Sequence, residues 1–159
     1  YGKLDYDIVF LKLKPEFSKV FSIRYLLAYL KSLPLLWLSY CMHDSTDIYK
    51  PNIFFNLPAP PESNDVNEVD KAVDEILELE RKYLEKEAQI RFLMKKAPQE
   101  RDSSLRSMEK KMKEHNDSIN DKSLFLDRHF LKEFDINDDE KMLMSTMLRN
   151  RKIFVNPNI

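Results

Sequence analysis

Few residues in the sequence are of the types that bind zinc. The thiol and imidazole groups are those of Cys41, His43, His115 and His129. Cys41 and His43 stand two positions apart and could supply two ligands, whereas a structural zinc site takes four, usually in pairs. We therefore expect Cys41 to be a small buried residue, the histidines to be incidental or interfacial, and the chain to bind no metal ion.

An acidic segment near the C-terminus partly matches a calcium-binding loop. Asp135, Asn137 and Asp139 stand at the first three ligand positions of an EF-hand. The sixth position, which should be glycine, is Glu140, and the twelfth, which should be glutamate, is Thr146. We predict instead that this segment caps the last helix and places acidic groups at its positive end.

The sequence contains no arrangement typical of an enzyme. Gly2 is the only glycine, so neither a G-x-S-x-G elbow nor a glycine-rich phosphate loop can form. Cys41 with a histidine and an acidic residue could in principle form a catalytic triad. The presence of these residue types alone is not specific, because a triad is recognised by its geometry. Paired carboxylates, such as Asp74 and Glu75, fall on charged helix faces, whereas a general acid needs surroundings that raise its pKa. We predict a protein that is not an enzyme and needs no cofactor.

Composition and charge also limit the partners. The 26 basic and 27 acidic residues give a net charge of −1, so no bulk field attracts nucleic acid. Acidic neighbours dilute the basic stretch around Lys110, Lys111 and Lys113, and residues 98–122 lack the aromatic groups on which bases stack. We expect no direct sequence-specific contact with nucleic acid.

The scarcity of glycine also bears on the fold. Average usage would give about 11 glycines in this length, so the chain avoids backbone positions that need positive φ. The apolar residues mostly recur with a helical period. We predict an all-α protein with an apolar helical head at 1–57 and a proline-rich elbow at 58–64. A long-helix coiled-coil or hairpin arm would follow at 65–122, then a C-terminal helical unit with an extended tail at 123–159.

The head is apolar and aromatic. Residues 4–13 fit a strand or a short helix, and helix is preferred because no second strand is evident nearby. Pro34 should break or kink the next helix before a second apolar segment at 35–42. The helix predicted over 16–33 would bury an aliphatic face formed by Val20, Ile23, Leu26, Leu27, Leu30 and Leu33.

Residues 20–42 are long enough to span a membrane, but Arg24, Lys31 and Pro34 make them a poor span. They could instead lie at a membrane surface with their aromatic rings at headgroup depth, and we keep this as the alternative to a core helical hairpin. The four aromatic residues concerned are Tyr25, Tyr29, Trp37 and Tyr40.

The arm begins with the clearest element. A helix over 65–97 would be about 50 Å long, capped by Ser63 or Asp65, and i,i+4 charge pairs such as Glu78–Lys82 would line its surface. One apolar seam comprises Val66, Val69, Val73, Ile76 and Tyr83, and Leu77, Leu84, Ile90 and Leu93 widen it.

Pro98 should separate this helix from a second one over 99–122. The second helix carries a narrow stripe with heptad spacing: Leu105, Met108, Met112, His115 and Ile119. Such a thin stripe needs a partner, either the first helix folded back or another chain, and the sequence leaves that choice open. A final helix should start near Asn137 or Asp138 and run to about Lys152.

The order of an apolar head, a proline-rich elbow and charged long helices resembles small subunits of eukaryotic multiprotein assemblies. Mediator-type, kinetochore-type and tethering-complex subunits share it, although no motif lets a functional residue be carried over. The resemblance implies an intracellular scaffold or adaptor, nuclear or cytoplasmic, that binds other helical subunits in a hetero-oligomer more readily than itself. A single cysteine and the absence of a visible signal peptide fit a reducing compartment. The predicted contact residues are Val69, Val73, Ile76, Leu77, Leu84, Leu105, Met108 and Met112.

Overall fold

The computed structural model describes residues 14–16, 18, 20–42, 57–94 and 102–150, with side chains from 105 onward in the last of these ranges. Within them it contains α-helices and no strand, which confirms the all-α prediction. The helices are α1 (Ile23–Lys31), α2 (Leu33–Met42), α4 (Val66–Leu93), α5 (Asp102–Glu133) and α6 (Asp138–Asn150).

Several predictions fall outside the described residues. These are the choice of strand or helix for 4–13, the break at Pro98 and the extended tail after 152. His43 and its spacing from Cys41 lie outside them as well.

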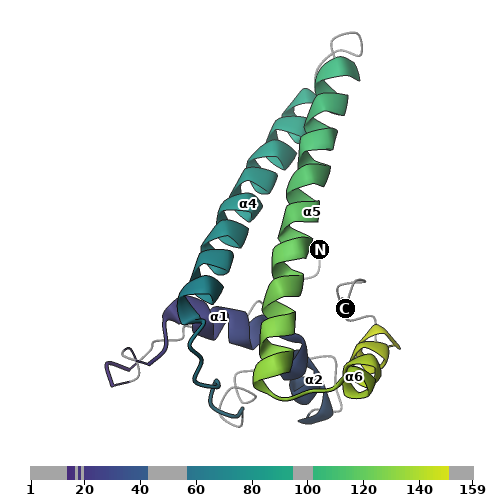
Figure 1. Cartoon of the computed structure of the whole chain (residues 1–159). Helices are drawn as coiled ribbons and strands as arrows, with labels where there is room; N and C mark the ends of the chain where they lie inside the picture. Colours follow the sequence, from purple (N-terminus) through teal and green to yellow (C-terminus); the bar gives the residue numbers. More distant parts are fainter. Residues whose placement is uncertain (1–13, 17, 19, 43–56, 95–101, 151–159) are drawn as a thin grey trace, which may run out of the picture.

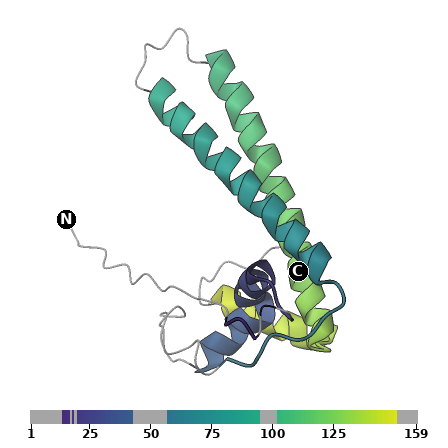
Figure 2. The same ribbon diagram turned by 90° about the vertical axis from the view of Figure 1, so that its left-hand side faces the viewer.

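Helices α4 and α5 form an antiparallel hairpin that projects from a base made by α1, α2 and α6 (Figure 1). The two helices also lie side by side after a quarter turn (Figure 2), so the second arm helix folds back along the first. The charged arm therefore provides its own partner, and the stripe from Leu105 to Ile119 is half-buried along its whole length.

The first two helices are separate because of local side-chain chemistry. Ser22 caps α1 by accepting a hydrogen bond from the backbone N–H of Tyr25 at 2.8 Å. Ser32 has extended backbone and separates the helices, and Pro34 follows in the first turn of α2, where a proline breaks no intrahelical bond. The predicted break near Pro34 is present, but it lies at Ser32, and Pro34 belongs to α2. The predicted start of the helix near residue 16 is wrong because Ser22 sets the start at Ile23.

The predicted buried face of α1 is also wrong in part. The side chains that α1 buries completely are those of Tyr25, Ala28 and Tyr29, whereas Ile23 remains 50% exposed and Val20 lies exposed before the helix. Helix α1 is apolar on more than one side, but only one side can pack against the core. That side is the aromatic one, which carries Tyr25 and Tyr29. Of the aliphatic face, Leu26, Leu27 and Leu30 remain half-buried at the edge of the core, and Ile23 is exposed.

The main core joins the base to the lower half of the arm. Phe130 of α5 is fully buried between Tyr25 and Tyr29 of α1, with ring centroids 5.3 and 5.8 Å apart. The hydroxyl of Tyr25 donates to the carbonyl of Pro61, and that of Tyr29 to the carbonyl of Pro58, so the elbow is fastened to α1. The whole buried cluster consists of Tyr25, Ala28, Tyr29, Leu35, Val69, Ala72, Val73, Ile76, Leu126 and Phe130.

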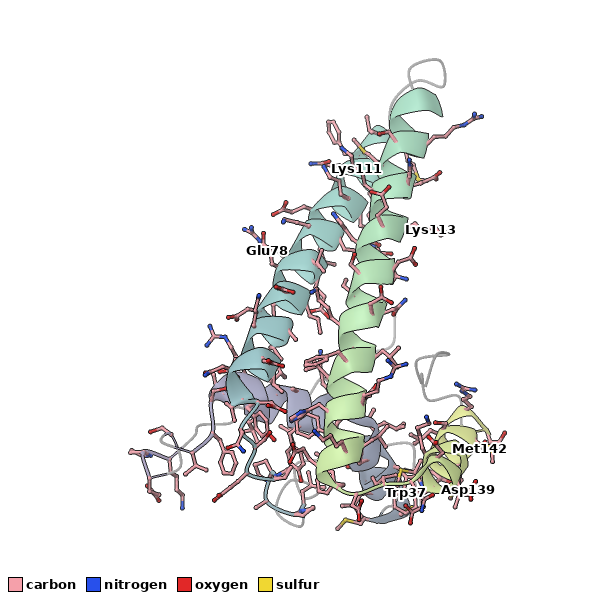
Figure 3. The ribbon with its side chains drawn as sticks, viewed as in Figure 1. Trp37, Glu78, Lys111, Lys113, Asp139 and Met142 are labelled. Atoms are coloured by element: carbon pink, nitrogen blue, oxygen red, sulfur yellow. The ribbon has the colours of Figure 1, made fainter. Side chains whose placement is uncertain are left out.

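A smaller cluster holds α6 against α2. Leu33, Leu131 and Leu148 are buried there, and Trp37 packs against them. The indole N–H of Trp37 donates to the sulfur of Met147 at 3.5 Å. Figure 3 shows Trp37 at the underside of the base, beside α6.

The second arm helix is longer than predicted. It continues through residue 122 to Glu133, because Leu126, Phe130 and Leu131 keep burying one face against the base. It ends in a Schellman motif: the N–H of Ile136 bonds to the carbonyl of Leu131 and that of Asp135 to the carbonyl of Lys132. Asp135 has φ 53, the left-handed conformation that such a motif needs.

The predicted capping segment at the start of α6 is confirmed. The backbone N–H of Glu140 donates to the side chain of Asn137, and the N–H of Asn137 donates to the carboxylate of Glu140, each at 3.0 Å. This reciprocal pair is a capping box. Asp138, Asp139 and Glu140 lie in the first helical turn, as expected for acidic groups at a positive helix end.

Ion pairs occur both between the arm helices and along α4. Lys122 of α5 forms an ion pair with Glu75 of α4, and this contact lowers the pKa of Glu75. Glu78, on the outer side of α4 (Figure 3), pairs with Lys82 at 3.4 Å as predicted and also with Arg81 at 3.0 Å. Glu87 and Arg91 form another i,i+4 pair along α4, at 2.7 Å.

Candidate functional site

An open groove lies where α1 crosses the outer side of α4. The aliphatic residues of α1 form one wall and Leu77 of α4 the other, around a volume of about 400 Å³. Leu77 is 45% exposed and Ile23 is 50% exposed. The residues that line the groove are Ile23, Arg24, Leu26, Leu27, Leu30, Asp74 and Leu77.

A second, deeper cavity of about 490 Å³ continues from this groove toward α5. The two share Leu27 and Leu77, so one apolar surface extends from the outer side of α1 into the space between α4 and α5. Leu36 of α2 and Ile119 of α5 add apolar lining. We call the two together the base groove.

Charged groups border the base groove. The guanidinium of Arg24 forms an ion pair with Asp74 across its outer edge, and this contact raises the pKa of Arg24. Lys31 and Glu80 line the inner part. An apolar floor with charges of both signs at its rim suits an amphipathic helix, whose apolar face would enter the groove while its polar face stays in water.

Asp127 lies at the inner end of the base groove. Its carboxylate accepts a hydrogen bond from the backbone N–H of Leu33 at 2.8 Å and so satisfies the start of α2. Burial raises the pKa of Asp127 to about 6, although the bond from Leu33 acts in the opposite direction.

The predicted contact residues occupy three different environments. Val69, Val73 and Ile76 are buried in the chain's own core and cannot meet a partner in this structure. Leu77 and Leu84 lie on the exposed side of α4, where Leu84 is 62% exposed. The three residues of α5 are half-buried in the hairpin: Leu105, Met108 and Met112. Three of the eight, Val73, Ile76 and Leu77, line the base groove, and Leu77 is the exposed one among them.

The aromatic residues proposed for a membrane surface are divided in the same way. Tyr25 and Tyr29 are fully buried, and burial raises the pKa of each to about 12. Trp37 and Tyr40 are half-buried against α6. Among the helices that the structure describes, none has the length and hydrophobicity needed to cross a membrane.

The structure also assembles a group of side chains that sequence patterns did not reveal. Asp65, His129 and Glu133 each place one possible metal-ligand atom within 4.8 Å of the others. The zinc ligands considered from the sequence were thiols and imidazoles, so the carboxylates of Asp65 and Glu133 were not among them. The signal available in the sequence was the i,i+4 spacing of His129 and Glu133, which places both on one helix face. Asp65 stands far from them in sequence, and only the fold brings it near.

Cys41 is exposed in the structure, contrary to the expectation of a buried thiol, although partial burial raises its pKa. A raised thiol pKa lowers the fraction of the nucleophilic thiolate at neutral pH.

No protein-family model matches this chain, and neither a curated protein nor a solved structure matches it significantly.

Proposed function

We propose that this protein is a non-catalytic α-helical scaffold or adaptor subunit of an intracellular complex, nuclear or cytoplasmic, and that it binds a partner through the base groove. The observation that carries this proposal is a contiguous apolar surface in which exposed Ile23 of α1 and Leu77 of α4 flank the partly exposed Leu26, Leu27 and Leu30. A folded chain ordinarily buries such a face, and contiguous exposed apolar surface marks interaction sites.

The partner that fits is an amphipathic helix of another protein. Its apolar residues would follow an i, i+3, i+4, i+7 pattern and lie against Leu27, Leu30 and Leu77. Removing a half-exposed leucine from water contributes about 1 kcal/mol. Several such contacts are therefore needed, which the length of the groove allows.

The test removes the apolar surface without disturbing the core. Leu77→Asp places a charge in the groove, and we expect it to abolish capture of the partner by the full chain in crosslinked co-purification. Met142→Asp is the matched control, because Met142 is an exposed apolar residue of α6 that lies away from the groove (Figure 3). We expect it to capture the same protein as the unmodified chain.

Two results would contradict the proposal. One is that Leu77→Asp, folded by circular dichroism, captures every protein that Met142→Asp captures. The other is that purified partner binds both variants with equal affinity. Ile76→Asp is unsuitable for this purpose because Ile76 is a core residue, and a charge there would unfold the chain.

The membrane-surface alternative has less support. Tyr25 and Tyr29 would have to leave a packed core, together with the hydrogen bonds from their hydroxyls to the elbow. Flotation of the chain with anionic lipid vesicles separates the two functions. Flotation of the unmodified chain, lost in Trp37→Ala, would favour the membrane function over the adaptor function.

A further inference from the structure

We infer that Asp65, His129 and Glu133 form a binding site for a divalent transition-metal ion and that Zn²⁺ is the ion it suits best. The site lies at the base of the hairpin, where α4 begins and α5 ends, and it is separate from the base groove. The inference therefore does not depend on the proposed function. Bound metal would hold the two arm helices together at this end.

The imidazole of His129 is the central observation. The residue is only 7% exposed, and its Nε2 atom is buried without any hydrogen-bond partner. Leaving a buried polar nitrogen unpaired is costly, and native proteins do so rarely. A metal ion bound through Nε2 would remove that cost. The ring is held in place by Phe130 and Tyr25, whose centroids lie 5.0 and 6.0 Å from it.

Both carboxylates retain free ligand atoms. Asp65 occupies the N-cap position of α4, where an aspartate ordinarily accepts a bond from the helix, yet its side chain makes no such cap bond. Glu133 accepts a hydrogen bond from the hydroxyl of Ser63 through Oε1 at 3.0 Å, which leaves Oε2 for a metal. The Ser63 hydroxyl also accepts from the backbone N–H of Asp65 at 3.1 Å. Ser63 is therefore a positioning residue of the kind that orients metal-ligating carboxylates.

The dimensions and chemistry fit zinc. One nitrogen and two oxygen ligands at about 2.0–2.2 Å, in tetrahedral directions, lie about 3.4 Å from one another. The ligand atoms here lie within 4.8 Å, so side-chain rotations that move them by roughly 1 Å would close the shell. Water would supply the fourth ligand. Two carboxylates would also balance the charge of the ion in this partly buried position.

The test is a titration of the full chain with Zn²⁺ alone, in competition with a chromophoric chelator. The parent protein carries Cys41→Ser, so that the exposed thiol does not contribute. We expect one ion per chain and a rise in Tm on addition of Zn²⁺. Glu133→Gln and Asp65→Asn keep the shape of each side chain, and each should weaken binding at least 10-fold. Ser63→Ala, which removes no ligand, should weaken it by about 10-fold.

The matched control combines Glu114→Gln with His115→Gln. These residues form another acid and imidazole pair on α5, higher on the arm, and we expect binding in that variant to equal that of the parent. His129→Gln should abolish binding. If that variant fails to fold, the two carboxylate variants decide the question, because they retain the imidazole. Absence of Zn²⁺ binding by the parent would overturn the site, and so would equal affinity in Glu133→Gln, Asp65→Asn and the control.

Discussion

At the scale of single residues, Asp127 shows how one side chain serves two elements at an energetic cost. It belongs to α5, yet it satisfies the first backbone N–H of α2 at 2.8 Å. The same burial that makes this bond useful disfavours its negative charge and raises its pKa to about 6. The base is thus held by a carboxylate whose negative charge costs more free energy in the folded state than in water.

This shift predicts a pH dependence of stability. In the unfolded chain an aspartate titrates near 3.9, so between about pH 4 and 6 the folded state binds more protons at Asp127 than the unfolded state does. The free energy of unfolding should therefore fall as the pH rises through this range, and the penalty should be complete above pH 6. Asp127→Asn keeps an acceptor oxygen for Leu33 and removes the ionisation.

We expect Asp127→Asn to be more stable than the unmodified chain by about 1–3 kcal/mol at pH 7, and by much less at pH 4. Urea unfolding at both pH values, with EDTA present to exclude metal, measures this difference. Carboxylates with lowered pKa values, such as Glu75 and Glu78, contribute equally to both proteins and cancel. A difference between the two proteins that does not change with pH would contradict the prediction.

Asp135 is the other residue that carries a conformational cost. Among the described residues it is the one non-glycine position with positive φ, at the point where α5 ends and the chain turns into α6. Aspartate tolerates the left-handed conformation better than most side chains do, although less well than glycine. The sequence has no glycine at this turn, so Asp135 adopts the left-handed conformation. The capping box of Asn137 and Glu140 follows directly and sets the start of α6.

At the scale of elements, the register of α4 against α5 is set by apolar packing and marked by one ion pair. Val69, Val73 and Ile76 of α4 enter the core that Leu126 and Phe130 of α5 complete. The pair of Glu75 and Lys122 lies beside this seam and joins the two helices. An exposed or half-exposed pair contributes little stability by itself, but it reports the register because it joins one position of α4 to one position of α5.

We therefore expect a zero-length carbodiimide crosslink between Glu75 and Lys122 within one chain. Digestion and mass spectrometry of the monomer would identify the joined peptides. Glu75→Gln should remove this crosslink. Glu114→Gln should leave it in place, because Glu114 lies on α5 itself, more than two helical turns before Lys122. Recovery of the joined peptides only from crosslinked dimers would show that the helices pair between chains and would contradict the fold-back arrangement.

At the scale of the whole molecule, the base and the arm share one core. Phe130 is fully buried between two tyrosines of α1, and its own helix forms half of the arm. Because the elbow is fastened to the same tyrosines, the start of α4 also depends on this cluster. The base and the lower arm should unfold together, although the hairpin tip, with exposed residues such as Phe92 and Met94, is free to open first.

Phe130→Ala should destabilise the chain by about 3–5 kcal/mol, which is a large part of the stability of an ordinary domain. Urea unfolding followed by circular dichroism measures the loss. Phe125→Ala is the control, since Phe125 lies on the same helix but is exposed, and it should cost less than about 1 kcal/mol. If Phe130→Ala is too unstable to fold, Phe130→Leu should still be less stable than Phe125→Ala. Equal effects of the two alanine variants would contradict the shared core.

The sequence alone determined the features that depend on neighbouring residues. The helical period and the single glycine indicate an all-α chain, Pro34 marks a helix boundary within two residues, and Asn137 with Glu140 sets the start of α6. Each of these depends on contacts within about four positions, so the local sequence contains the whole cause. The stripe of α5 likewise predicts that one side is buried, whichever element covers it.

Only the tertiary structure decided which surfaces meet. In the folded chain α5 lies back along α4. The aromatic face of α1 packs in the core because Phe130 fills the space between Tyr25 and Tyr29. Helix α5 also extends to Glu133, since burial against the base continues past residue 122. The base groove and the cluster of Asp65, His129 and Glu133 follow from these choices. Their residues are distant in sequence, and they come together because burial and packing of apolar side chains throughout the chain stabilise this fold.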